Sequence, residues 1–77
     1  MNKERRKRLE DVISQLENLQ AEVASIQEEE LEAYENMTEG LQQSERGQTI
    51  EENASELEDL DSDFEELLDN LREIVER

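Results

Sequence analysis

The feature that most constrains this chain is a spacing of three and four residues that runs without a break through each half of the chain, at positions that are apolar except for Glu30 and Asp61. The chain contains no proline that would interrupt a helix. Spacing of this kind is typical of amphipathic helices and coiled coils, and it predicts an all-α protein. The positions in the first half are Leu9, Val12, Leu16, Leu19, Val23, Ile26, Glu30, Ala33 and Met37, and those in the second half are Ile50, Ala54, Leu57, Asp61, Phe64, Leu68, Leu71 and Val75.

Both glycines of the chain fall between the two patterns, together with several turn-forming residues. Asn2 is the expected N-cap of the first helix. Two residues are candidate N-caps of the second: Ser44, and Thr49 with Glu52 completing a capping box. The expected elements of a single domain over residues 1–77 are a helix near 3–37, a loop near 38–44 and a second helix near 45–76.

The two patterns match from end to end when the second is reversed. Facing residues would then have numbers that add up to 87, as in Met37 with Ile50, Val23 with Phe64 and Val12 with Val75. This match predicts an antiparallel two-helix coiled-coil hairpin. Two acidic residues interrupt the apolar seam, at positions 30 and 61. They either fix the register of the helices or mark a solvated part of the seam.

A single seam between two helices is a small core, and the chain has no cysteine for a disulfide. Further apolar residues widen the apolar face beyond what one helix covers. They predict a homodimer in which two hairpins form a four-helix bundle. The expected dimer interface consists of Ile13, Leu31, Leu60, Leu67 and Ile74.

Charge is distributed very unevenly along the chain, which carries a net charge of −16. Residues 9–71 contain 21 acidic residues and one basic residue, Arg46, whereas residues 3–8 contain five basic residues. At a helical rise of 1.5 Å the expected hairpin is about 43 Å long, with roughly one net negative charge per ~2 Å. This density is close to that of duplex DNA, at one phosphate per ~1.7 Å.

The acidic surface has two interpretations. It either occupies the nucleic-acid-binding cleft of another protein, or it only keeps the chain in solution. The basic residues 3–8 also have two interpretations, which are contact with an anionic surface and neutralisation of Glu73 and Glu76.

Catalytic, cofactor and metal sites are not expected. The chain has no cysteine or histidine, which removes the commonest nucleophiles, bases and zinc ligands. The acidic run from Asp59 to Glu65 resembles a calcium loop, but Phe64 replaces the required glycine and Asn70 the required glutamate. The longest apolar runs are doublets, so no membrane-spanning helix is expected either.

Three short segments resemble small acidic proteins encoded by bacteriophages and prophages. They are Met1-Asn2-Lys3-Glu4-Arg5-Arg6-Lys7, Glu32-Ala33-Tyr34-Glu35-Asn36-Met37 and Ser44-Glu45-Arg46-Gly47. The resemblance implies a phage setting in the cytoplasm of a bacterial host. In that setting small acidic proteins often inhibit host nucleases, as anti-CRISPR and anti-restriction proteins do.

Two hypotheses on function follow. The first is an inhibitor that mimics DNA and binds a protein with a basic, nucleic-acid-binding cleft, without itself contacting nucleic acid or membrane. The second is a dimeric coiled-coil structural or adaptor protein whose acidic face only solvates it. In the first, carboxylates would replace phosphates and residues near the loop would add specificity. The carboxylates are Glu28, Glu29, Glu32, Glu58, Asp59, Asp63 and Glu66, and the residues near the loop are Tyr34, Met37, Leu41 and Arg46.

Overall fold

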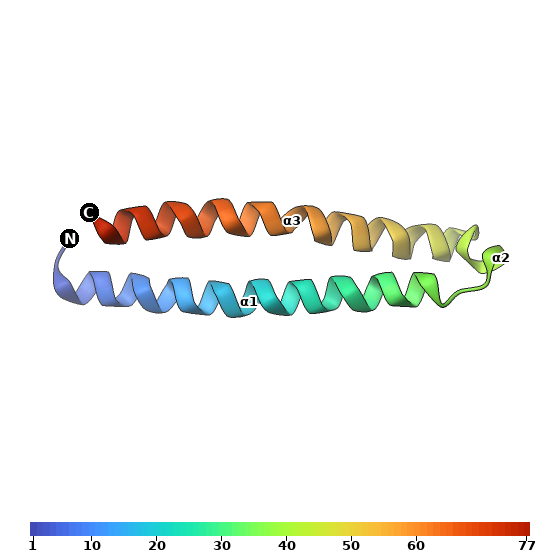
Figure 1. Cartoon of the computed structure of the whole chain (residues 1–77), viewed down its shortest axis with the longest axis horizontal. Coiled ribbons are helices and arrows are strands. Elements are labelled where there is room, and N and C mark those ends of the chain that lie inside the picture. The colour runs from blue at the N-terminus through green and yellow to red at the C-terminus, as the bar shows by residue number, and fades with distance from the viewer.

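The computed structural model describes all residues 1–77 and contains three helices and no strand. These are α1 (Lys3–Glu35), α2 (Glu39–Gln42) and α3 (Glu45–Glu76), as Figure 1 shows. The prediction of an all-α chain is confirmed. α3 has the bounds expected from the sequence, whereas α1 ends two residues earlier than expected. The expected loop contains the short helix α2.

Polar side chains cap the start of each helix. The Asn2 side chain accepts a hydrogen bond from the backbone N–H of Arg5 at 2.8 Å, and Ser44 Oγ accepts one from the N–H of Gly47 at 3.2 Å. Thr49 lies inside α3, and its hydroxyl donates to the carbonyl of Glu45 at 3.0 Å. Of the two candidate caps of α3, Ser44 is therefore the one that the chain uses.

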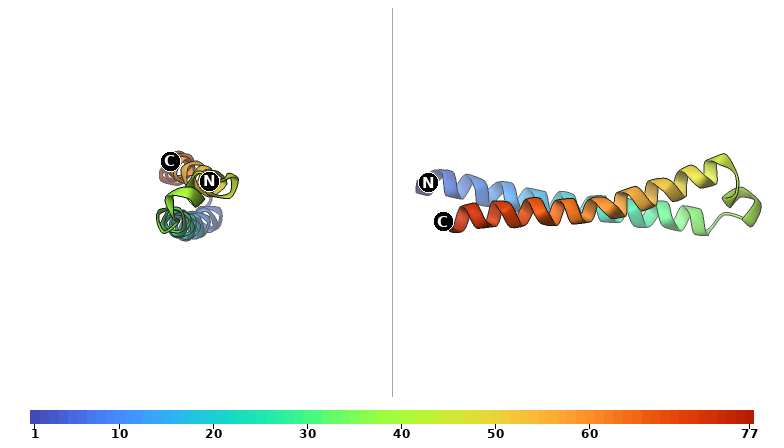
Figure 2. Two further views of the ribbon diagram at one scale, coloured as in Figure 1. Left: turned by 90° about the vertical axis from the view of Figure 1, so that its right-hand side faces the viewer. Right: turned by 90° about the horizontal axis from the view of Figure 1, so that it is seen from above.

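α1 and α3 lie side by side and run in opposite directions (Figure 1). Both ends of the chain lie at one end of the molecule, and α2 lies at the other. Seen from above, the two helices cross at a shallow angle (Figure 2), as long helices do when side chains of one fit between those of the other. The molecule is a rod of 58 × 15 × 13 Å. We refer to α1 and α3 together as the helix pair.

The seam between the two helices is narrow. Only three apolar side chains are buried, namely Ile13, Ala54 and Leu68, and only Leu68 is completely covered. Most inward-facing residues are half-buried, and they repeat with spacings of three and four along both helices. In and just after α1 they are Arg6, Leu9, Ile13, Leu16, Gln20, Val23, Gln27, Glu30, Tyr34 and Met37, and in α3 they are Gly47, Ile50, Ala54, Leu57, Phe64, Leu68, Leu71 and Val75.

The predicted seam is right for α3, except that Asp61 is exposed, but four of the nine positions predicted for the first helix are wrong. Val12, Leu19 and Ile26 are exposed by 42%, 55% and 42%, and Ala33 is also exposed. The inward positions belong instead to the residues that follow each of them in sequence, which are Ile13, Gln20, Gln27 and Tyr34.

This difference changes the register of the two helices. An inward-facing residue of α1 lies level with an inward-facing residue of α3 when their numbers add up to 84, as in Leu9 with Val75 and Leu16 with Leu68. The predicted sum is 87. Polar side chains explain how glutamine is tolerated at the seam. The amide of Gln20 donates to Asp61 at 3.0 Å and to Glu65 at 2.7 Å, so its polar atoms are satisfied across the pair.

The connection between α1 and α3 is closely packed. The Gln42 side-chain amide donates to the carbonyl of Tyr34 at 3.0 Å, which ties α2 to the end of α1. Gly47 is buried in the first turn of α3, against the backbone of α2. A Cβ atom at this position would meet the carbonyl oxygen of Leu41, and it would lie 2.6 Å from that of Gln42. The close approach of α2 to α3 therefore requires glycine at position 47.

Candidate functional site

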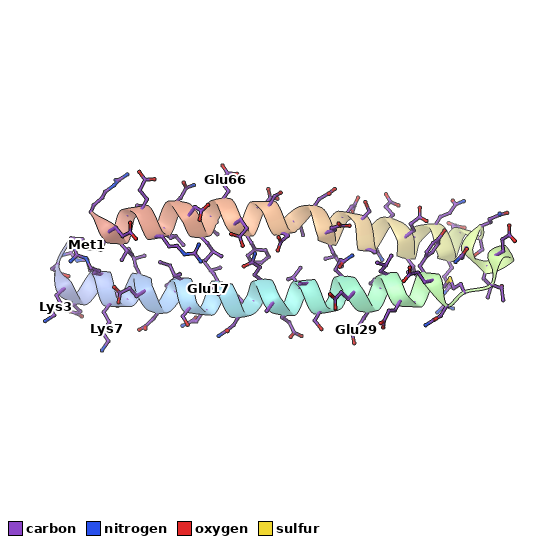
Figure 3. All side chains as sticks on the ribbon, viewed as in Figure 1. Met1, Lys3, Lys7, Glu17, Glu29 and Glu66 are labelled. Atoms are coloured by element: carbon purple, nitrogen blue, oxygen red, sulfur yellow. The ribbon has the colours of Figure 1, made fainter.

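The most extensive chemical feature of the surface is its carboxylates. Of the 24 acidic residues only Glu30 is half-buried, and all the others are exposed. They are distributed along the whole rod. In Figure 3, Glu29 projects from α1 and Glu66 projects from α3 on opposite outer edges of the helix pair. The negative charge therefore extends over more than one side of the molecule.

Almost none of these carboxylates has a cationic partner. The three ion pairs are Arg72 with Glu17 at 3.8 Å, Arg72 with Asp69 at 3.2 Å, and Arg77 with Glu73 at 3.6 Å. Both arginines lie outside residues 9–71, and the Arg72 side chain is half-buried whereas the other four pairing side chains are exposed. Within the molecule, 21 of the 24 carboxylates have no ion-pair partner, so their charge is available to another molecule.

The basic residues 3–8 form no ion pair, so none of them pairs directly with Glu73 or Glu76. Glu73 pairs instead with Arg77. Arg5 and Arg8 line a shallow hollow on α1, together with Met1, Leu9, Asp11, Val12 and Gln15. Figure 3 shows Lys3 and Lys7 projecting outward from the same end of α1.

The carboxylates expected to replace phosphates occupy two groups, one on each long helix. Glu28, Glu29 and Glu32 are exposed on the second half of α1, and Glu58, Asp59, Asp63 and Glu66 are exposed in the middle of α3. No group of three or more acidic side chains is arranged to hold a metal ion. The geometry is that of a distributed anionic surface.

The residues expected to add specificity are in two different environments. Tyr34 and Met37 are half-buried at the end of the seam. Leu41 is 55% exposed on α2. Arg46 is exposed in the first turn of α3, where it lines a shallow hollow with Ser44, Glu45, Thr49 and Ile50. Leu41 and Arg46 are therefore the two that have most surface for contact with another molecule.

Tyr34 faces a carboxylate of α3. The pKa of the Tyr34 hydroxyl is raised above its ordinary value of 10.0, first because the Glu51 carboxylate accepts a hydrogen bond from the protonated hydroxyl. Partial burial and the negative charge of Glu51 act in the same direction. The protonated form thus contributes stability that is complete below the unfolded pKa, and this stability is lost as the pH rises through the folded pKa.

We expect the absorbance of tyrosinate to report this contact, because Tyr34 is the only tyrosine and the chain has no tryptophan. Its titration midpoint should lie higher in the folded protein than in denaturant. Glu51→Gln should lower the midpoint towards 10.0. Glu52→Gln, at the neighbouring exposed position, is the matched control. Equal midpoints in all three proteins would contradict a specific contact between Tyr34 and Glu51.

The residues expected at a dimer interface also differ in exposure. Ile13 is buried between α1 and α3, which leaves it little surface for a second chain. Leu31, Leu60, Leu67 and Ile74 are exposed. Val12, Leu19 and Ile26 are exposed apolar residues that the sequence reasoning assigned to the seam. The signal that identifies them as a set is their regular spacing of seven residues.

Comparison with known proteins identifies no relative of this chain. No protein-family model, curated protein or solved structure matches the chain. None of its helices combines the length and the apolar character needed to cross a membrane.

Proposed function

We propose that this chain is a small acidic inhibitor, of the phage anti-CRISPR or anti-restriction type, that binds a nucleic-acid-processing protein of a bacterial host by mimicking DNA. It acts in the host cytoplasm and catalyses no reaction. The observation that carries the proposal is the set of 21 exposed or half-exposed carboxylates without an ion-pair partner, spread along a rod 58 Å long.

Charge density supports DNA as the mimicked molecule. A net charge of −16 over 58 Å gives one negative charge per ~3.6 Å for one chain. Two chains lying side by side would carry −32 over the same length, or one charge per ~1.8 Å. Duplex DNA has one phosphate per ~1.7 Å of its axis. The dimer therefore matches DNA more closely than the single chain does.

The dimer is part of the proposal. We infer that the helix pair is an antiparallel coiled-coil hairpin and that two such hairpins form a four-helix bundle. The accessible surface of the chain is 6055 Å², whereas a compact monomer of 9.1 kDa would expose about 4,900 Å². A second chain would cover part of this excess.

The mechanism is occupation of a basic cleft. Lys and Arg side chains that normally bind phosphates would bind carboxylates such as Glu28, Glu32, Glu58 and Asp63, and the counterions of both surfaces would be released. No internal ion pair has to break first, because these carboxylates have none. A large negative field also accelerates encounter with a positively charged target. Leu41 and Arg46 would add contacts that distinguish one target from another.

A dimeric structural or adaptor protein is the second candidate function. The exposed apolar residues Leu60, Leu67 and Ile74 favour it, because they suit the binding of another helix. In that case the carboxylates would only solvate the rod. The two functions differ in how binding responds to salt.

The test uses purified protein with a CRISPR nuclease and a restriction endonuclease, measuring both binding to the nuclease and cleavage of DNA. We expect stoichiometric inhibition at low salt. Binding should weaken by at least an order of magnitude between ~50 and ~200 mM salt, since each phosphate-like contact adds to the salt dependence.

Charge-reversal variants complete the test. Replacing Glu28, Glu32, Glu58 and Asp63 with lysine should abolish binding. The matched control replaces the exposed neutral residues Ser14, Asn18, Ser25 and Ser55 with alanine and should bind as the unmodified chain does. Binding that survives half-molar salt, or that survives the four reversals, would refute mimicry and favour the adaptor function.

A further inference from the structure

Six exposed apolar residues form a regular series on the two long helices. In α1 they are Val12, Leu19 and Ile26, and in α3 they are Leu60, Leu67 and Ile74, with exposures between 37% and 55%. Within each helix they are seven residues apart, which keeps them on one side of a coiled-coil helix. We call these six residues the apolar strip.

An ion pair shows that both halves of the strip lie on the same side of the helix pair. Glu17 lies four residues after the inward-facing Ile13, and Arg72 lies four residues after the inward-facing Leu68. The Glu17 carboxylate and the Arg72 guanidinium form an ion pair at 3.8 Å. These positions therefore share one side of the pair. The residues directly before Ile13 and Leu68 lie on the other side of the seam. They are Val12 and Leu67, which belong to the strip.

The strip is symmetric about its centre. Within the strip, Val12 of α1 lies nearest to Ile74 of α3, Leu19 to Leu67, and Ile26 to Leu60, each pair being offset by two residues, or ~3 Å, from the register of the inward residues. A rotation of 180° about an axis that crosses the helix pair at Leu19 and Leu67 brings Val12 to the level of Ile26 and Leu60 to the level of Ile74. Two copies of the strip can therefore face each other with apolar residues opposite apolar residues throughout.

We propose that a second copy of this chain covers the apolar strip in a head-to-tail orientation, with the two-fold axis passing at the level of Leu19 and Leu67. Leu19 then faces Leu19 of the second copy, and Val12 faces Ile26 of the second copy. The inference rests on the dimer of the proposed function and specifies its interface and its orientation. Facing residues of α1 in the two copies have numbers that add up to 38.

Charge selects head-to-tail over head-to-head packing. In the head-to-tail dimer, the basic residues 3–8 lie beside residues 30–35 of the second copy, and Arg8 comes level with Glu30. Residues 28–35 contain five glutamates, and residues 3–8 contain five cations that form no ion pair within the chain. Head-to-head packing would instead place residues 3–8 beside the end of α3 of the second copy, where residues 72–77 carry two arginines and two glutamates and so no net charge.

The face is also large enough for a stable dimer. A side 58 Å long and 15 Å wide corresponds to roughly 850 Å² per chain, or about 1,700 Å² in total. Stable protein interfaces bury about 1,600 Å². Leu31 lies four residues after Gln27, so it belongs to the side of the ion pair and not to this face.

Single cysteines test the orientation, because the chain has none of its own. Leu19→Cys should cross-link to itself in high yield with a short bismaleimide. Val12→Cys alone should not, because its two copies would lie fourteen residues, or ~21 Å, apart along α1. A mixture of Val12→Cys and Ile26→Cys should give the mixed dimer. Efficient cross-linking of Val12→Cys with Ile74→Cys, and none of Leu19→Cys alone, would overturn the head-to-tail orientation.

The interface itself is tested by sedimentation. The unmodified chain should have twice its mass of 9.1 kDa at micromolar concentration. Leu19→Gln with Leu67→Gln should halve that mass, whereas the matched pair Leu31→Gln with Leu41→Gln should not. A monomeric unmodified chain, or halving by the control pair alone, would overturn this inference. Loss of nuclease inhibition by a dimer that is intact would instead refute the proposed function.

Discussion

Replacing Leu68 with alanine is expected to lower the free energy of unfolding by about 3 kcal/mol. Leu68 is the only large side chain of the chain that is completely buried, and it lies level with Leu16 in the seam. Its removal would leave a cavity that two helices cannot close by a small shift. The measurement is thermal or urea unfolding followed by circular dichroism at a fixed protein concentration.

Leu41→Ala provides the matched control for the same change of side chain. Leu41 is 55% exposed, so its truncation should change the free energy of unfolding by no more than about 0.5 kcal/mol. Equal losses for the two variants would show that the seam around Leu68 does not hold the helix pair together.

The sequence predicts α3 well because this helix has one dense apolar pattern. Ile50, Ala54, Leu57, Leu68 and Val75 face inward as their spacing predicts. The other apolar residues of α3 recur only once in every seven positions, so they do not compete for the seam. The helix bounds are also predictable, because Ser44 caps the start of α3.

The sequence predicts α1 less well because two overlapping patterns share Leu9, Leu16 and Val23. Hydropathy favours the pattern that continues through Leu19, whereas the structure uses the pattern that continues through Gln20. The choice depends on α3, whose carboxylates accept both hydrogen bonds of the Gln20 amide. A polar contact of this kind is not visible in the hydropathy of one helix taken alone.

The use of Gln20 rather than Leu19 at the seam also changes which apolar residues are exposed on the helix pair. The apolar residues of α1 that lie outside the seam, such as Leu19, form half of the apolar strip. In the proposed dimer, burial of this strip favours association of the acidic rod with a second copy. Association brings more negative charge into the same length, which costs free energy through repulsion. We propose that burial of apolar surface and the pairing of residues 3–8 with the glutamates of a second copy offset that cost. In the proposed dimer, the same chain thereby gains both stability and a DNA-like charge density.

Gly47→Ala is expected to destabilise the protein by about 2 kcal/mol, although alanine favours a helix more than glycine does. A Cβ atom at position 47 would meet the backbone of α2, where it would lie 2.7 Å from the Cα atom of Gln42. Backbone atoms cannot rotate away as a side chain can, so α2 has to move. The helix would lose its packing on α3 and the hydrogen bond between Gln42 and the carbonyl of Tyr34.

Gly40→Ala separates this steric effect from helix propensity. Position 40 lies in α2, and a Cβ atom there meets nothing within 4 Å. Alanine should therefore be neutral or should stabilise the protein by up to about 1 kcal/mol, through the lower entropy of the unfolded chain. The unfolding curve of Gly47→Ala should shift to lower stability, whereas that of Gly40→Ala should stay in place or shift to higher stability. A shift of both in the same direction would show that α2 does not pack against Gly47 as closely as the structure indicates.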